Sequence, residues 1–258
     1  MNHVEDWAAA YIASTDLAYK LAPPPVPEIW ATAFQPLRVL APGRPPELVA
    51  ATRRMKAPKP GALIHAAKRA LLLHGFLHHE LQAAELMCWA ILAFPCAPLA
   101  FRRGLLKIAH DELRHMAMYR AHLSTLGYAY GAFEVNDWFW TRVPLAVDAA
   151  SFLATLGVGL EGGNLDHAPR FAAALLAAGD AEAARIEAQI GREEIPHCAF
   201  ALHWLAELAG KDDFDTWRSR LVPPLTPLMM RGDPVNADDR ARAGYSPEFI
   251  AALRGWTP

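Results

Sequence analysis

Cysteine is scarce in this chain and forms no pattern typical of metal or disulfide sites. The 258 residues include three cysteines, Cys88, Cys96 and Cys198, and no Cys-x-x-Cys pair. The odd number argues against a disulfide framework, and the missing pair argues against a zinc–cysteine site. We expect Cys198, which follows His197, to act as a small buried apolar group.

Long hydrophobic runs are also missing. No apolar stretch approaches the roughly 18 residues needed to cross a membrane. The start of the chain, residues 1–6 (MNHVED), has neither the basic residues nor the apolar stretch of a secretory signal. We therefore expect a cytoplasmic protein with no membrane partner.

Neither sign of charge is in large excess. Lysine and arginine number 25 against 27 aspartates and glutamates, which gives a net charge of −2. Strong nonspecific binding of nucleic acid needs a basic balance, so a nucleic-acid partner is not expected. Hydrophobic residues make up 53 % of the chain, which is a globular composition with enough material for a full core.

Sequence signals for β-strands are nearly absent, and the pattern predicts an all-α fold. Alanine and leucine are abundant, and apolar residues recur at spacings of three and four. Asp180 is a good N-cap, Ser246 with Pro247 begins a helix, and Gly179 and Gly210 are typical helix ends. The expected helices cover residues 4–20, 61–94, 98–126, 144–178, 180–210, 213–221 and 246–254.

The lengths of the connections predict how these helices are arranged. Short joins make the first and second long helices antiparallel neighbours, and likewise the third and fourth. Residues 127–143 are long enough for a crossover, so the body (61–210) is expected to be a ferritin-like four-helix bundle. Ten prolines mark residues 22–60 as an extended arm, which makes 1–60 an N-terminal helix and arm packed on the body. Residues 211–258 form a third part with short helices.

Two Glu-x-x-His motifs carry the chemistry. Glu112 and His115 lie three residues apart on one expected helix, and Glu194 and His197 do so on another. This spacing places both side chains on one helix face. Two such motifs on facing helices can hold two metal ions, with one carboxylate from each remaining helix.

Two further glutamates stand at matched distances from these motifs. Glu80 precedes Glu112 by 32 residues, and Glu161 precedes Glu194 by 33. A hairpin of two long helices brings residues at this separation to the same height, and both glutamates lie among apolar neighbours. A buried lone carboxylate is costly unless it is paired, protonated or metal-bound. The alternative to a dimetal site is a core network of ion pairs and hydrogen bonds.

Three other side chains are additional candidates. Glu85 competes with Glu80 and shares a polar helix face with His74, His78 and Gln82. That face is either wet, or packed between helices, or it supplies an extra ligand or substrate contact. Asp166 stands at the same offset from Glu161 as Glu85 from Glu80, and Tyr119 shares the face of Glu112.

Acidic residues precede both motifs and are candidates to orient the histidines. A metal-bound histidine usually donates its second N–H to a carboxylate. Asp111 is expected to orient His197 and Glu193 to orient His115, with Arg114 paired to one of these acids. The alternative is that all three are ordinary solvated helix charges.

Helix-weakening residues lie beside the motifs. Pro196 stands between Glu194 and His197, and Gly162 and Gly163 follow Glu161. Proline removes a helix hydrogen bond, and kinks or π-bulges often mark functional sites. We expect locally loosened helices here, either to let a carboxylate change its binding mode or to meet a packing need.

The complete pattern resembles a known superfamily. Glu80, Glu112-x-x-His115, Glu161 and Glu194-x-x-His197 are similar to the ligands of ferritin-like dimetal-carboxylate proteins, and residues 111–115 (DELRH) to the Asp-Glu-x-Arg-His motif of bacterial multicomponent monooxygenases. Residues 79–95, 101–105 and 160–168 resemble a narrower bacterial group, domain of unknown function 455, sometimes labelled tRNA-hydroxylase-like. The resemblance covers roughly residues 60–210.

This resemblance implies two iron ions, or manganese and iron, that activate dioxygen. A set of carboxylates with two imidazoles suits these metals better than magnesium or calcium. The expected function is hydroxylation or oxidation of a small organic molecule, with an electron-donor protein as a further partner. Residues 136–140 (NDWFW) and the arm either line a substrate cavity or simply pack.

Other functions and assemblies remain open at this level. A ferroxidase or a rubrerythrin-like peroxidase would use the same ligands. A non-catalytic helical binding or scaffold protein would keep the bundle with a degenerate site. The sequence does not fix the oligomeric state, for which a homodimer is one option.

Overall fold

A computed structural model describes residues 1–53 and 56–258. Within these ranges the ordered elements are helices, and the only strand-like feature is one isolated bridge between Ala50 and Val135. The all-α prediction is confirmed. In the described part of the chain no helix combines the length and the apolar character needed to cross a membrane.

The chain divides into two compact units, residues 1–144 and 145–258. Each unit contains one pair of long antiparallel helices and one Glu-x-x-His motif. The sequence analysis instead divides the chain into residues 1–60, 61–210 and 211–258, and that three-part division stays a prediction. A short 3-10 turn, η2 (Val143–Leu145), lies at the boundary.

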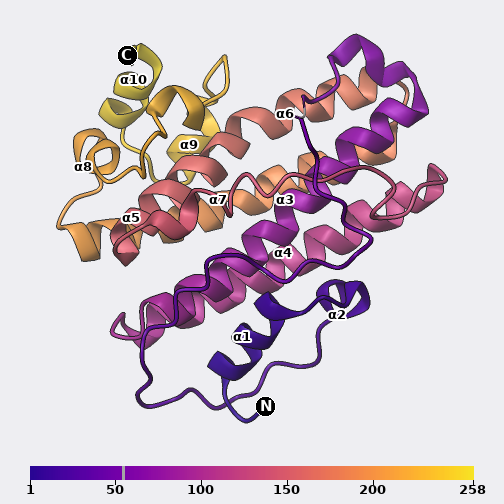
Figure 1. Ribbon diagram of the computed structural model, residues 1–258. Helices are drawn as coiled ribbons and strands as arrows, with labels where there is room; N and C mark the ends of the chain where they lie inside the picture. The colour runs from indigo at the N-terminus through magenta and orange to yellow at the C-terminus, as the bar shows by residue number, and fades with distance from the viewer. Residues whose placement is uncertain (54–55) are drawn as a thin grey trace. The chain divides into compact units, whose positions relative to one another are not determined.

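The first unit is built on the hairpin of α3 (Ala66–Ala93) and α4 (Leu99–Thr125), which run side by side in Figure 1. The helix α1 (Val4–Ala13) packs on α3, and α2 (Leu17–Leu21) contacts α4. A 3-10 turn, η1 (Pro60–Ile64), leads into α3. The single helix expected over residues 4–20 is wrong, because the Asp16 side chain accepts hydrogen bonds that begin a new helix at Leu17.

The proline-rich arm follows the surface of α3. Leu37 donates its backbone N–H to the carbonyl of Leu92, and the Trp89 indole donates to the carbonyl of Val39, both at 3.0 Å. The connection between α4 and α5 covers the same helix further along. As a result α3 is buried on its polar face as well as its apolar one, including His74, His78, Gln82 and Glu85.

The second unit pairs α7 (Ala181–Ala209) with a helix in three pieces: α5 (Ala149–Thr155), the π-helix η3 (Leu156–Glu161) and α6 (Gly162–Ala177). The one continuous helix expected over 144–178 therefore contains a wide turn. Gly179 has φ of 83° and ends α6, and the Asp180 side chain caps α7, as expected. At Gly191 an added Cβ would lie 2.7 Å from the Cβ of Ala168, so glycine permits the close approach of α6 and α7.

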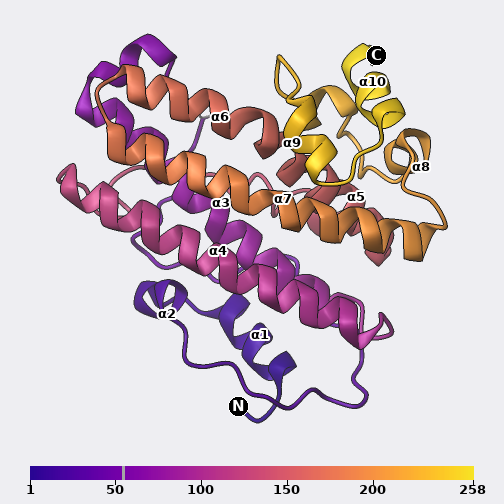
Figure 2. The same cartoon turned by 180° about the vertical axis from the view of Figure 1, so that it is seen from behind.

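Short helices complete the second unit and gather at one end of α7 (Figure 2). Two of them, α8 (Phe214–Ser219) and α10 (Pro247–Gly255), match the expected positions, with Ser246 capping α10. The sequence analysis missed α9 (Ala237–Arg242) and the 3-10 turn η4 (Pro227–Met230). An aromatic cluster joins α8 to α10 and is formed by Phe214, Trp217, Tyr245 and Phe249.

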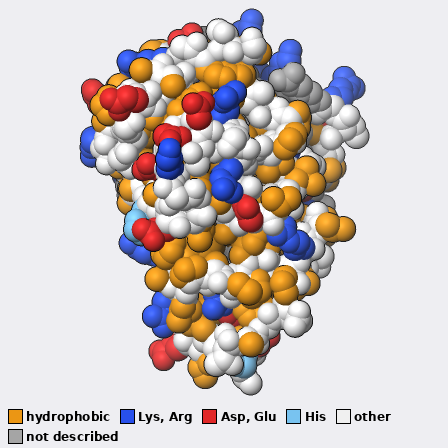
Figure 3. Space-filling view, turned by 90° about the vertical axis from the view of Figure 1, so that its left-hand side faces the viewer, with side chains coloured by type: hydrophobic (Ala, Val, Ile, Leu, Met, Phe, Trp, Pro, Cys, Tyr) orange, Lys and Arg blue, Asp and Glu red, His pale blue; other side chains and the backbone are white. Residues whose placement is uncertain are grey.

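The surface mixes side chains of every type. Figure 3 shows acidic, basic and hydrophobic groups interspersed on one face of the molecule. This fits the nearly balanced charge of the chain.

Candidate metal centre

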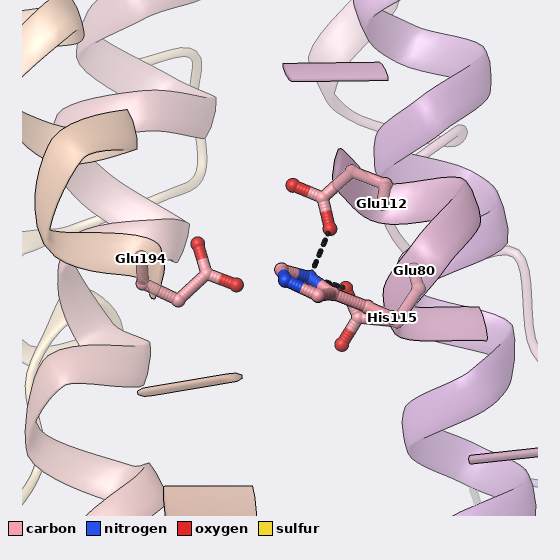
Figure 4. A group of neighbouring side chains, drawn as sticks. All are labelled: Glu80, Glu112, His115 and Glu194. Atoms are coloured by element: carbon pink, nitrogen blue, oxygen red, sulfur yellow. Dashed lines mark hydrogen bonds and ion pairs between the residues drawn. The ribbon is translucent and has the colours of Figure 1, made fainter. Parts of the chain in front are cut away.

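The hairpin of the first unit brings together Glu80, Glu112 and His115. Each of these residues offers a ligand atom within 4.8 Å of the others, and Figure 4 shows the three side chains pointing toward one another from α3 and α4. His115 Nδ1 lies 3.0 Å from a Glu112 oxygen and 3.7 Å from a Glu80 oxygen. All three residues are at most 7 % exposed, so the cluster is shielded from water.

The electrostatics of this cluster follow from two carboxylates placed close together in the core. Burial and the neighbouring Glu112 raise the pKa of Glu80 well above its ordinary value. Burial opposes charge on His115, but its hydrogen bonds to Glu112 and Glu80 outweigh burial and raise its pKa to about 11. A positive charge is therefore strongly favoured between these carboxylates.

The second unit repeats the arrangement with Glu161, Glu194 and His197. Their ligand atoms also lie within 4.8 Å of one another, and His197 Nδ1 is 3.1 Å from a Glu194 oxygen. The three residues are at most 4 % exposed. Burial has the largest effect on the nearby Cys198 thiol and raises its pKa, and the charges of Glu161 and Glu194 raise it further. This cysteine is therefore neutral.

Glu161 is the last residue of the π-helix. The N–H of Gly162 bonds to the carbonyl of Gly157, five residues back, which is the wide turn of a π-helix. The glycines after Glu161 were expected to loosen this helix, and the wide turn lies immediately before them. Pro196 does not interrupt α7, which continues from Ala181 to Ala209.

Glu85 belongs to a different network. Its carboxylate accepts from Lys20 Nζ at 2.6 Å, from Arg44 at 2.6 and 2.9 Å, and from the Trp140 indole at 2.8 Å. Arg44 also donates a hydrogen bond to the Asp137 carboxylate at 2.6 Å. Because its oxygens are used in this way, Glu85 is placed as an ion-pair partner, and Glu80 is the α3 carboxylate that lies with the Glu-x-x-His motif.

The polar face of α3 is dry and packed between segments. His78 lies 2.6 Å from the Tyr130 hydroxyl and 3.1 Å from Asp137, and Gln82 bonds the backbone at Asn136 and Phe139. Residues 136–140 therefore pack on α3 through specific hydrogen bonds. The wet alternative for this face is wrong, since the arm and the connection cover it.

Asp166 also has a role in holding segments together. Its carboxylate accepts the backbone N–H of Gly232 and of Asn236, both at 2.8 Å, and pairs with Arg240 at 2.8 and 3.0 Å. Asp166 thus anchors the C-terminal segment to α6, whereas the sequence analysis named it as an additional candidate for the site.

The acids before the two motifs are less buried than the motifs themselves. Arg114 donates to Asp111 at 3.0 Å on the partly exposed side of α4, and Gln189 donates to Glu193 on α7. The two expected histidine pairings, Asp111 with His197 and Glu193 with His115, stay predictions. Tyr119 is 2 % exposed, one turn beyond His115, with its ring 5.8 Å from that of Phe76.

Sequence reasoning missed the groups that support the clusters. Lys20 and Arg44 were not identified as partners of Glu85. The complete burial of Lys20 is unusual for a lysine and becomes visible only in the structure. Tyr245 and Trp217 were also missed; they bond the carbonyls of Val158 and Ala154, in and beside the π-helix.

The donor set of each cluster fits a divalent transition-metal ion. Two carboxylates and one imidazole are the ligand types that iron and manganese accept, and two ionised carboxylates balance one divalent charge. The ligand atoms of each cluster lie close enough to share one ion. The same atoms also form the hydrogen-bonded ion pairs that the sequence offered as the alternative.

Comparison with known proteins places the chain in a family. A protein of Haemophilus influenzae, described as "Uncharacterized protein", is 29 % identical over 187 residues, which are 69 % of this chain and 65 % of that protein. The chain thus spans slightly under two thirds of the length of this curated relative. No solved structure matches.

A family model described as "Protein of unknown function (DUF455)" matches residues 4–251, a wider span than the 60–210 on which the sequence resemblance rested. The match includes both clusters and also the arm and the short C-terminal helices. The chain therefore belongs to the DUF455 family.

Proposed function

We propose that this protein is a dimetal-carboxylate oxidoreductase. It holds two iron ions, or one manganese and one iron, and uses dioxygen to hydroxylate or oxidise a small organic molecule. An electron-donor protein supplies the reducing equivalents. The observation that carries the proposal is the repeated buried group of two glutamates and one histidine, one on each helix hairpin.

The proposed architecture is a ferritin-like four-helix bundle. Glu80 and Glu161 are then the carboxylates contributed by the helices that lack a histidine. The support for this is the pair of matched hairpins, each with its own motif.

The chain's own residues have defined tasks under this proposal. Glu80, Glu112 and His115 hold one ion, while Glu161, Glu194 and His197 hold the other. Their burial excludes water from the reacting atoms, which protects reactive intermediates. When bound, the metal pair supplies the redox chemistry needed to activate dioxygen.

Metal content is the first test. The protein is purified aerobically from medium supplemented with iron and manganese, beside the double variant Glu112→Ala, Glu194→Ala. About two Fe or Mn ions per chain are expected, because each cluster balances one divalent charge, and the double variant is expected to lose both. Glu207→Ala, an exposed change on α7, is the matched control and keeps both ions.

Single variants separate one shared centre from two independent sites. Independent sites would lose one ion in Glu112→Ala and the other in Glu194→Ala. A shared centre loses more than one ion in either variant, and its two paramagnetic ions are magnetically coupled in Mössbauer or EPR spectra. A folded wild type that holds no metal, and does not take up Fe(II) without oxygen, would overturn the proposal.

The reaction is tested after the metal. Dioxygen uptake by the Fe(II)-loaded protein, with candidate organic compounds and a chemical reductant, should yield oxygenated or dehydrogenated product in the wild type and none in the double variant. Repeated oxidation of added Fe(II) with storage of the product in a large assembly would instead support iron handling.

A further inference from the structure

A cavity of about 450 Å³ lies in the second unit, and none of the six cluster residues lines it. Its wall is formed by His167 of α6, Arg254 of α10 and residues in the segment 228–235. This volume is within the range of about 300–1,000 Å³ typical of small-molecule sites. Neither the proposed metal chemistry nor the family description gives this cavity a role.

Asp166 holds in place the segment that lines the cavity. That carboxylate fixes the N–H groups of Gly232 and Asn236, and its ion pair with Arg240 is 1 % exposed or less on both sides. An added Cβ at Gly232 would lie 2.7 Å from the Asp166 Cβ and 3.3 Å from His167 Nδ1. A glycine is therefore required for the segment to pass this closely over α6, and the bonds of Asp166 fix the position of this wall.

The charged groups around the cavity favour an anion. The lining contains two arginines, Arg231 and Arg254, and one carboxylate, Asp233, which leaves one net positive charge in a chain whose total charge is −2. Arg231 is engaged, since it donates to the carbonyls of Leu253, Arg254 and Trp256 at the end of α10.

Two groups retain unused donors. Arg254 gives one N–H to the carbonyl of Val235, and in the described structure its other guanidinium nitrogens make no hydrogen bond. Within the same described residues, His167 has a ring contact with Phe171 and no hydrogen bond. Guanidinium groups pair with carboxylates and phosphates through two parallel hydrogen bonds, which gives both strength and direction.

We propose that this cavity binds a small organic anion, with its carboxylate or phosphate on Arg254 and His167. The apolar part of the ligand lies against Leu228, Pro234 and Val235, which complete the wall. The site is separate from the metal clusters, and its ligand is bound by pairing and packing without any covalent step.

Titration calorimetry on the full-length protein tests this proposal with defined probes. Benzoate and phenyl phosphate are the two anionic probes, inorganic phosphate tests the headgroup alone, and benzyl alcohol is the neutral control. At least one of the organic anions is expected to bind, and Arg254→Gln and His167→Gln should each weaken it by about tenfold, equivalent to about 1.4 kcal/mol. Arg185→Gln, a change at an exposed arginine on α7 outside the cavity wall, should bind as the wild type does.

Several outcomes would overturn the proposal. They are no binding of either organic anion at millimolar concentration, equal binding of benzyl alcohol, or unchanged binding in both Arg254→Gln and His167→Gln. The His167 variant keeps the bond from Arg254 to Val235, so it decides the question if Arg254→Gln fails to fold. The double variant Glu112→Ala, Glu194→Ala should bind the anion normally, which separates this site from the metal centre.

Discussion

Two buried glutamates on one helix, Glu80 and Glu85, illustrate how partners decide the role of a side chain. Glu85 lies against two cations, Lys20 and Arg44, and its ion pairs are 2.6 Å long. Glu80 lies against a second carboxylate, Glu112; burial first, and Glu112 next, raise the pKa of Glu80 well above its ordinary value. The first is therefore balanced within the protein, whereas the second gains most from an additional cation.

Glu85→Gln should be strongly destabilising. The change leaves the charges of Lys20 and Arg44 buried without their shared partner, and breaking a buried pair in this way costs about 3–5 kcal/mol. Denaturant unfolding measures the loss. Metal content should be unchanged in whatever fraction stays folded.

Glu80→Gln should have the opposite profile. Burial and Glu112 raise the pKa of Glu80, so its carboxyl favours the neutral form in the metal-free protein. A neutral amide of the same shape should therefore change the free energy of unfolding by less than about 1 kcal/mol. Metal loading should fall clearly below that of the wild type. If Glu80→Gln kept its metal and Glu85→Gln lost it, the assignment of the two residues would be reversed.

His74 predicts a specific dependence of stability on pH. Burial, with a smaller effect of His78, lowers the pKa of His74 from 6.5 to about 4. The unfolded chain binds a proton near pH 6.5 and the folded one only near pH 4, so stability falls as the pH drops through this window. Each pH unit between the two pKa values corresponds to about 1.4 kcal/mol, which gives a loss of about 3 kcal/mol by pH 4.

The variant His74→Phe isolates this contribution. It loses the acceptor for the Gly131 N–H, which lowers stability by a constant amount, but its stability should decline less than that of the wild type between pH 6.5 and 4. His65→Gln, at an exposed position, is the control. Parallel stability curves for wild type and His74→Phe would show that His74 does not keep a lowered pKa.

At the scale of elements, the π-helix that ends at Glu161 is held in place by hydrogen bonds from the C-terminal segment. The Tyr245 hydroxyl donates to the carbonyl of Val158 and the Trp217 indole to that of Ala154, each at 2.8 Å. A wide turn disturbs the regular ladder of helix hydrogen bonds, and buried carbonyls need partners. The C-terminal segment therefore supports the backbone that carries Glu161.

A double-mutant cycle at Gly162 and Tyr245 tests this support. An added Cβ at Gly162 would collide with the Tyr245 hydroxyl, so Gly162→Ala should be destabilising by about 1–3 kcal/mol. Tyr245→Phe leaves the Val158 carbonyl without its donor, which also costs about 1–3 kcal/mol. The double variant should cost less than the sum by about 1 kcal/mol, because Phe removes the colliding oxygen. Strict additivity in denaturant unfolding would show that the two groups do not meet.

The sequence predicts the long helices well and the interruption poorly. Caps and apolar periodicity are local signals, so the positions of α3, α4 and α7 follow from them. The wide turn ending at Glu161 depends on donors such as Tyr245, more than 80 residues away, which no local pattern reveals. The missed helix α9 has a good cap in Asn236, but it is short and its arginine, Arg240, is buried against Asp166.

At the scale of the whole molecule, the internal repeat explains why the clusters were predictable. In an antiparallel hairpin, residues about 32 apart across the tight turn reach the same height, so spacing alone pairs Glu80 with Glu112 and Glu161 with Glu194. The division of the chain at residue 144 was not predictable in the same way. The connection after α4 belongs to the first unit through contacts such as those of Asp137 and Trp140, which composition does not reveal.

The proposal of one metal centre shared by the two Glu-x-x-His motifs predicts that metal binding couples the unfolding of the two compact units. At a free metal concentration of 100 times the dissociation constant, binding adds about 2.7 kcal/mol, which corresponds to an increase of about 5–10 °C in the unfolding temperature. We expect calorimetry to show one sharp transition in the loaded wild type and a lower, broader or divided transition after chelation. The variant Glu112→Ala, Glu194→Ala should resemble the chelated protein under both conditions, and Glu207→Ala should follow the wild type. If the loaded protein instead unfolded in two steps with only one of them shifted, the metal would be confined to one unit, and the shared centre would be wrong.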